Sequence, residues 1–218
     1  MALADLTLPE LRLALAPAIA RAAVFDGWSE AAVDAAALDL GIAPAAARLA
    51  FPGGAADMIG AWIERIDADA ALTLPQQSLA GLRVPERIRR LVEFRIDAVT
   101  GREEALRRAL AILAMPQNIA AAARFSWSSA DLMWRLAGDT ATDFNHYSKR
   151  AILASLVAAT LAVLIDDRSE GRAETRAFLD RRLQDVARFE KAKARLRRDD
   201  AEHFSLVRLL GRLRYPAR

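Results

Sequence analysis

Residues 7–50 read TLPELRLALAPAIARAAVFDGWSEAAVDAAALDLGIAPAAARLA, and this stretch decides the fold class. Thr7–Glu10 has the order of a capping box with proline in the first turn, which predicts a helix running to about Phe25. Ser29 can cap a second helix that Gly41 closes, and Pro44 can begin a short third helix. Three helical segments without period-two alternation predict an all-α protein.

Helical periodicity continues along the rest of the chain. Further helices are predicted at about 55–71, from Pro85, from a second capping box at Thr100–Glu103, and at about 117–125, 130–137, 143–166, 174–197 and 201–214. Residues 75–83 are predicted to form a loop. The expected fold is therefore all-α with about ten helices.

Composition limits the chemistry that this chain can carry. The 218 residues are 54% hydrophobic and 27% charged, which suffices for one sizeable packed core. The absence of cysteine excludes disulfides, thiolate zinc sites and iron–sulfur clusters, and two histidines exclude a multi-histidine metal site. Residues 1–65 hold 4 basic and 8 acidic residues, whereas residues 151–218 hold 15 basic and 10 acidic residues. The chain is acidic in front and basic behind.

The first three predicted helices have the spacing of a helix-turn-helix. A DNA reader needs donors on the third helix, and Arg48 is the only basic residue there. Nearby acids such as Asp34 and Asp39 would repel a duplex. We therefore expect a packing unit and no nucleic-acid partner.

No catalytic constellation is visible in the sequence. GxGxxG, phosphate-loop and G-x-S-x-G patterns are absent. Asp143-x-x-His146 is one approximate carboxylate–histidine pair, whereas di-iron bundles use two such pairs and two more glutamates. We expect no cofactor, no metal and no enzymatic activity.

The densest group of unusual residues is ADLMWRLAGDTATDFNHYSKRA at 130–151. It resembles the signature of the Coq-nine family, the accessory lipid-binding proteins of ubiquinone (coenzyme Q) biosynthesis. The matching positions are Asp131, Trp134, Ala137, Gly138, Asp139, Thr142, Asp143, Phe144, Asn145, Tyr147, Arg150 and Ala151. Residues 51–54, 164–167 and 178–191 also resemble members, so the resemblance covers about residues 10–197.

The resemblance implies a fold similar to TetR-type transcription regulators, with a helix-turn-helix-like unit and a helical domain that forms a homodimer. It implies a non-catalytic protein that binds an isoprenoid or quinone-type lipid. The lipid would be a quinone precursor, presented to the membrane-associated demethoxyubiquinone hydroxylase. The alternative function is a TetR-like transcription regulator with an apolar effector.

The resemblance also points to a docking surface for the hydroxylase. Its candidate residues are Trp134, Asp143, Asn145, His146 and Tyr147. His146 stands where the family has tryptophan, which reduces the apolar area and adds a possible charge. The alternative role of this stretch is to cap the helix that follows it.

Residues 151–165 form the longest apolar run, shorter than the roughly 20 residues of a spanning helix. Apolar residues on all sides predict a helix that is buried all round. It could line a lipid pocket or pack against its copy in a dimer. The lipid-pocket candidates are Ile112, Met115, Ile119, Phe125, Leu156, Ala159 and Val163. An ordinary place in the core is the alternative for each of them.

The C-terminal segment has the pattern of a basic amphipathic helix at a membrane surface. Its candidate membrane-contact residues are Leu206, Val207, Leu209, Leu210, Leu213, Arg208 and Arg212. Packing on its own domain is the alternative. We thus expect an N-terminal unit at 1–65, a lipid-binding and dimerisation region at 66–198 and the amphipathic helix at 199–218. The absence of a transit-peptide pattern predicts a bacterial cytoplasmic protein, peripheral at the inner membrane.

Overall fold

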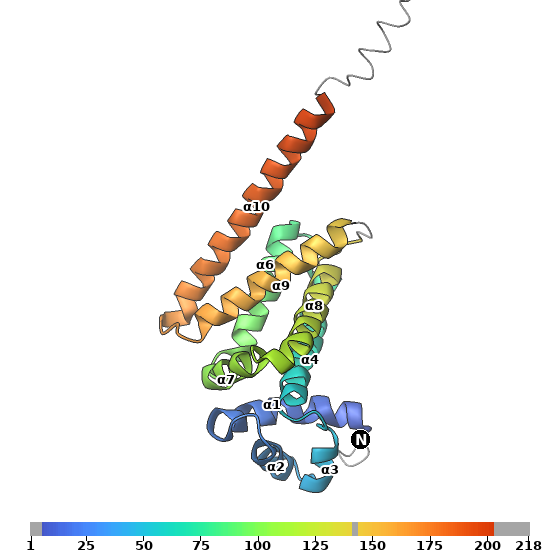
Figure 1. The fold of residues 1–218 in the computed structure, drawn as a ribbon, viewed down its shortest axis with the longest axis vertical. Helices are drawn as coiled ribbons and strands as arrows, with labels where there is room; N and C mark the ends of the chain where they lie inside the picture. The colour runs from blue at the N-terminus through green and yellow to red at the C-terminus, as the bar shows by residue number, and fades with distance from the viewer. Residues whose placement is uncertain (1–5, 141–143, 203–218) are drawn as a thin grey trace, which may run out of the picture. The chain divides into compact units, whose positions relative to one another are not determined.

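The computed structural model describes residues 6–140 and 144–202. This part of the chain contains ten α-helices and no strand, which confirms the all-α prediction (Figure 1). The α-helices are α1 (Leu8–Asp26), α2 (Glu30–Asp39), α3 (Pro44–Leu49), α4 (Ala55–Thr73), α5 (Gln76–Leu79), α6 (Val84–Val99), α7 (Glu103–Leu113), α8 (Ile119–Leu136), α9 (Phe144–Leu164) and α10 (Ala173–Glu202). Two 3₁₀ turns, η2 (Pro116–Asn118) and η3 (Glu170–Arg172), precede α8 and α10.

The predicted starts of the first helices are confirmed. The Glu10 carboxylate accepts a hydrogen bond from the backbone N–H of Thr7 at 2.9 Å. The Ser29 hydroxyl accepts one from the backbone N–H of Ala32 at 3.4 Å. Both contacts satisfy polar groups that a helix N-terminus leaves free.

Two predictions of where helices begin and end are wrong. The predicted loop at 75–83 contains α5. The predicted capping box at Thr100 does not form, because the Thr100 hydroxyl donates to the carbonyl of Ile96 and Arg102 is the N-cap of α7.

Two further predictions placed breaks between helices, at 126–129 and at 198–200, where α8 and α10 run unbroken. Serines at 126, 128 and 129 lie in the predicted break within α8. Ser129 is instead buried, and its hydroxyl donates to Asp67 at 2.6 Å. Tertiary contacts therefore override local propensity here.

The first helices pack closely on the helices that follow. α1 lies against α2 and α4, and its buried face includes Leu15 and Ile19 (Figure 1). The rings of Trp28 and Trp62 have centroids 5.4 Å apart. The Trp28 indole N–H donates to the carbonyl of Ala105 at 2.9 Å, which fixes the start of α2 to α7.

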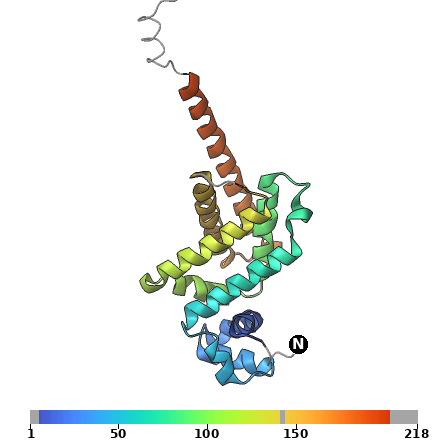
Figure 2. The same cartoon turned by 90° about the vertical axis from the view of Figure 1, so that its right-hand side faces the viewer.

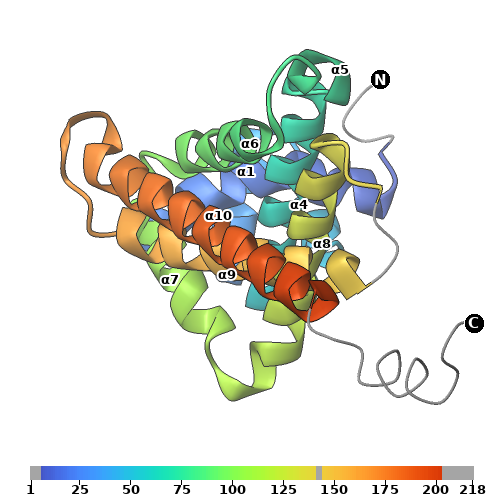
Figure 3. The same ribbon diagram turned by 90° about the horizontal axis from the view of Figure 1, so that it is seen from above.

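Five helices, α4, α6, α7, α8 and α9, enclose the rest of the core. α4 and α8 run side by side, as the cyan and yellow-green helices of Figure 2 show. α9 packs against α8 and also contacts α6 and α7 (Figure 3). This arrangement positions both parts of the candidate site described below.

The sequence predicted that α9 is buried on all sides, and this prediction is wrong. Leu153, Thr160 and Leu164 face the core, whereas Ala158 and Ala159 are exposed. Among the described residues, 145–164 form one helix that is long and apolar enough to span a membrane by length and composition, although a core helix passes the same test. The packing of α9 against α8 fits a core helix.

The contacts within the chain define two compact units, Met1–Leu179 and Asp180–Arg218. α10 begins in the first unit, where Leu179 is fully buried, and continues into the second. In the second unit Arg182 and Asp185 form an ion pair at 2.8 Å. The functional division at 65 and 198 and the similarity to TetR-type regulators stay predictions.

Candidate functional site

The first half of the motif at 130–151 contains the residues that end α8. Gly138 has a φ of 83°, a left-handed conformation that favours glycine. The N–H of Asp139 donates to the carbonyl of Trp134, and the N–H of Gly138 donates to that of Arg135, both at 2.9 Å. These two bonds form a Schellman motif, which stops α8 and aims Asp139 toward α9.

Asp139 belongs to a buried ion network centred on Arg150. The Arg150 side chain is only 2% exposed and binds Asp131 at 2.6 Å and Asp139 at 3.2 Å. Its guanidinium also donates to the carbonyl of His146 at 3.0 Å. Lys149 donates to Asp139 at 2.6 Å. The network therefore ties the end of α8 to the start of α9.

The electrostatics of Asp139 reflect this network. Burial alone would raise the pKa of Asp139, but the hydrogen bonds from Lys149 and Arg150 outweigh it and hold that pKa below its ordinary value. Trp134 adds a further tie, because its indole N–H donates to the carbonyl of Lys149 at 3.0 Å. The Lys149 ammonium lies 5.2 Å from the centre of the Trp134 ring.

Beside this network lies an aromatic patch formed by Trp127, His146 and Tyr147. Tyr147 is 61% exposed and Trp127 is 36% exposed. The ring centroids of Trp127 and Tyr147 are 6.0 Å apart, and those of His146 and Tyr147 are 5.1 Å apart. α8 and α9 thus present aromatic rings together at the surface.

The structure places the predicted docking residues in different environments. Tyr147 is exposed, whereas Trp134, Asn145 and His146 are half-buried. Asp143 lies outside the described residues. Trp127 was not among the predicted docking residues, although it lies seven residues before Trp134 on one helix and therefore on a similar side.

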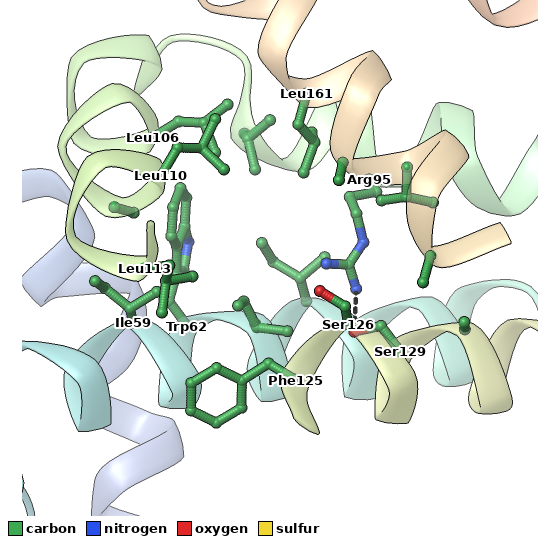
Figure 4. Close-up of a pocket in the computed structure, with 18 residues that line it drawn as sticks. Ile59, Trp62, Arg95, Leu106, Leu110, Leu113, Phe125, Ser126, Ser129 and Leu161 are labelled. Carbon is green, nitrogen blue, oxygen red and sulfur yellow. Dashed lines mark hydrogen bonds between the residues drawn. The ribbon is translucent and has the colours of Figure 1, made fainter. Parts of the chain in front are cut away.

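The second part of the site is a cavity of about 90 Å³ among α4, α6, α7, α8 and α9 (Figure 4). Its walls are mostly apolar and include Trp62, Leu110 and Phe125. Two lining residues, Ser126 and Ala158, are exposed, which places the mouth of the cavity between α8 and α9. The cavity is therefore apolar inside and reaches the surface.

One wall of the cavity is polar. Arg95 is 5% exposed, and its guanidinium binds Asp67 and donates to the Ser129 hydroxyl at 3.1 Å (Figure 4). Ser129 in turn donates to Asp67 at 2.6 Å. The Nε–H of Arg95 is buried and has no protein acceptor. Arg95 was not among the predicted site residues, since nothing in the local sequence pattern marks an inward-facing arginine on α6.

The predicted lipid-pocket residues are spread over several places. Phe125 lines the cavity, and Leu156 is buried outside its lining. The others are half-buried or exposed: Ile112, Met115, Ile119, Ala159 and Val163. Their role in lipid binding stays a prediction. Ile112, Met115 and Ile119 lie at the connection between two cavity-lining helices, α7 and α8.

Two further expectations concern other regions. The membrane-contact candidates Leu206, Val207, Leu209, Leu210, Leu213, Arg208 and Arg212 lie outside the described residues. In the part that the structure describes, no group of three or more histidine, aspartate or glutamate side chains could hold a metal ion.

The family model for COQ9 matches residues 119–190, which contain α8, α9 and the motif between them. The chain belongs to the COQ9 family. Rat mitochondrial ubiquinone biosynthesis protein COQ9 (Rattus norvegicus) is 35% identical over 168 residues, which cover 73% of this chain and 53% of the relative. The human protein (Homo sapiens) is 34% identical, with 73% and 52% covered. The probable coq9 of Dictyostelium discoideum is 25% identical, with 77% and 56% covered.

These comparisons bear out the resemblance of the motif to the COQ9 family. The chain spans about half the length of the curated relatives that it matches. The comparisons also contradict the predicted location in the bacterial cytoplasm at the inner membrane, because the named relatives are mitochondrial proteins of eukaryotes. That prediction rested on a missing transit-peptide pattern, and a chain whose match spans only about half of its relatives gives no such information.

Proposed function

We propose that this chain is a non-catalytic lipid-binding accessory protein of ubiquinone biosynthesis. The relatives are named as ubiquinone biosynthesis proteins, which supports a role in that process. The lipid would be an isoprenoid or quinone-type precursor. It would enter the cavity among α4, α6, α7, α8 and α9, and the chain would present it to a demethoxyubiquinone hydroxylase.

The observation that carries the docking part is that the motif and the nearby Trp127 provide two sets of side chains, one buried and one at the surface. Asp139 and Arg150 turn inward and join α8 to α9. Tyr147 and Trp127 keep their rings at the surface. Exposed aromatic rings on a rigid frame are typical anchors of a protein interface.

The hydroxylase is the partner that the family resemblance implies for this aromatic patch. His146 replaces the family's tryptophan at its edge, so the apolar contact area of the patch is smaller. We therefore expect binding that depends on Trp127 and Tyr147 more than on position 146.

A binding assay between the purified chain and demethoxyubiquinone hydroxylase tests this proposal. Trp127→Ser with Tyr147→Ser should weaken binding at least about tenfold, since truncating a hot-spot residue costs about 2 kcal/mol or more. Phe25→Ser is the matched control, because Phe25 is an 83% exposed aromatic residue on α1. Equal affinities of both variants and the unaltered chain would refute docking through the patch.

The cavity supports lipid binding but limits how the lipid is held. An apolar cavity of about 150 Å³ admits benzene, whereas this one measures about 90 Å³. It would therefore receive one compact group of the lipid. The remainder would leave through the mouth between α8 and α9, near Ser126 and Ala158.

The proposal includes a homodimer and contact with a membrane surface. The exposed small residues Ala159 and Ala162 give α9 a face on which a second copy could approach closely. Ala159→Glu with Ala162→Glu should convert the dimer to a monomer in sedimentation experiments. A variant that stays dimeric would refute dimerisation through α9.

For the membrane contact, liposome flotation should be lost when Leu206, Leu209 and Leu213 are replaced by aspartate. Flotation that persists in this variant would refute membrane contact through these residues.

The structure gives no support to the alternative, a transcription regulator. Arg48 is the one basic residue of α3, and its guanidinium binds Asp34 through Nε at 2.8 Å. Glu30 lies 3.9 Å from it. The charge that DNA phosphates would need is therefore committed to acids of α2.

A further inference from the structure

We propose that a surface hollow between the end of α1 and the turn from α6 to α7 binds a small aromatic carboxylate. Its volume is about 400 Å³, within the range of about 300–1,000 Å³ typical of small-molecule sites. The lining residues are Arg21, Val24, Phe25, Thr100, Gly101 and Arg102. None of them lines the cavity proposed for the lipid, so this inference does not depend on lipid binding.

The first step of the argument is a cation without a counterion. Arg102 is half-buried, and its guanidinium donates to the carbonyl of Ala98 at 3.3 Å. In the part of the chain that the structure describes, Arg102 forms no ion pair. The carboxylate of its neighbour Glu103 is bound by Arg172 and by the N–H of Gly101. The hollow therefore contains a positive charge that an anionic ligand can neutralise.

The second step is the charge balance around the hollow. Arg21 adds a second cation on the α1 side, and it pairs with Asp39 at 3.0 Å. Both of these side chains are more than half exposed, so water weakens their attraction. Asp26 is exposed at the end of α1 and is not part of the lining. With Arg102 as the one unpaired cation of the lining, a monoanion such as a carboxylate fits better than a dianion.

The third step is an aromatic wall on a fixed backbone. Phe25 is 83% exposed, so most of its ring surface is open to a ligand. The Arg108 guanidinium donates to the carbonyl of Phe25 at 3.2 Å and to that of Ala23 at 3.4 Å. These bonds hold the end of α1, which packs against α7 (Figure 1), and they offset the repulsion of an anion by its free carbonyl groups. A ring beside a cation favours a ligand that joins a planar ring to its carboxylate.

The test titrates the purified full chain with four probes: benzoate, benzamide, acetate and phenyl phosphate. Binding at pH 7 is followed in ¹H–¹⁵N spectra, in which benzoate should move the backbone signals of Phe25 and Gly101. We expect benzoate to bind at least about tenfold tighter than benzamide, which has the same shape without the charge. Acetate lacks the ring and should bind at least about threefold more weakly than benzoate. Phenyl phosphate carries about two negative charges and should bind no tighter than benzoate.

Two variants assign the charge and the ring to their residues. Arg102→Gln should remove the preference for benzoate over benzamide, and Phe25→Ser should remove the preference for benzoate over acetate. Arg83→Gln is the matched control, because Arg83 is an arginine with an 87% exposed side chain at the other end of α6. Its affinity for benzoate should equal that of the unaltered chain.

Several results would overturn the inference. Equal affinities for benzoate and benzamide would show that Arg102 does not select an anion, and tighter binding of phenyl phosphate would contradict selection of a monoanion. Benzoate that leaves the Phe25 and Gly101 signals unmoved would bind elsewhere. Absence of binding by all four probes would overturn the hollow as a ligand site. These comparisons use the unaltered chain, so they stand even if Arg102→Gln does not fold.

Discussion

Replacing Arg150 by methionine should destabilise the chain far more than the same change at Arg135. Both guanidinium groups bind Asp131, Arg150 at 2.6 Å and Arg135 at 3.1 Å. The Arg150 side chain is 2% exposed, whereas that of Arg135 is 64% exposed. The pair of variants therefore compares a buried and an exposed arginine on one carboxylate.

The expected magnitudes follow from burial. Removing one partner of a buried ion pair costs about 3–5 kcal/mol, and Arg150→Met should lie near the lower end because Lys149 still binds Asp139. For a chain of this size each kcal/mol lowers Tm by about 2–4 °C, so a decrease of about 6–12 °C is expected. An exposed ion pair contributes at most about 1 kcal/mol, so Arg135→Met should lower Tm by about 4 °C or less.

Thermal unfolding at pH 7, followed by circular dichroism at 222 nm, measures both variants. Adding Asp139→Asn to Arg150→Met should recover part of the lost stability, since it removes a buried carboxylate that has lost one of its two cations. Equal and small decreases in Tm for Arg150→Met and Arg135→Met would show that the network contributes little, and the account of the motif would fail.

Three other changes test the site in the same way. Gly60→Ala places a Cβ 2.5 Å from the buried Phe125 ring, so calorimetry should show a net destabilisation of about 1–2 kcal/mol. Phe125→Leu should relieve this destabilisation, and an unchanged Tm of Gly60→Ala would contradict the packing of α4 against Phe125. Gly138→Ala strains a position with a φ of 83° and should lower the free energy of unfolding by about 1–2 kcal/mol in urea titrations, whereas no loss would argue against the Schellman motif. Because the pKa of Asp139 is lowered in the folded chain, the stability that this carboxylate contributes is fully present above the ordinary aspartate pKa and is lost as pH falls through the folded-state pKa. Asp139→Asn should therefore flatten the loss of stability in acid, measured by urea titration at several pH values. An identical pH profile would refute a lowered pKa for Asp139.

Local signals in the sequence predicted most of the fold. Proline and capping residues at Thr7, Ser29 and Pro44 marked the first helices correctly because helix ends depend on nearby side chains. The break predicted within α8 was wrong, since the hydroxyl of Ser129 is satisfied by Asp67, 62 residues away. The sequence shows no sign of such a long-range contact.

The candidate site was only partly predictable for the same reason. The motif pointed to the junction of α8 and α9 and to the exposed Tyr147. It did not reveal that Arg150 is the buried centre of that junction, nor that Arg95 enters the cavity from α6. Both facts depend on how helices distant in sequence pack. The exposed face of α9 was likewise not predictable, because apolar and small residues occupy all sides of that helix. Only the helices that pack against α9 decide which of these residues are buried.

Mass spectrometry of the organic extract of the freshly purified chain tests lipid binding in the cavity most directly. The unaltered chain should yield an isoprenoid or quinone-type lipid in a stoichiometric amount. A folded Leu110→Trp variant, in which a lining residue fills the cavity, should yield little. An unaltered chain that carries no such lipid and stays empty when offered one, or a variant that retains it fully, would contradict the account.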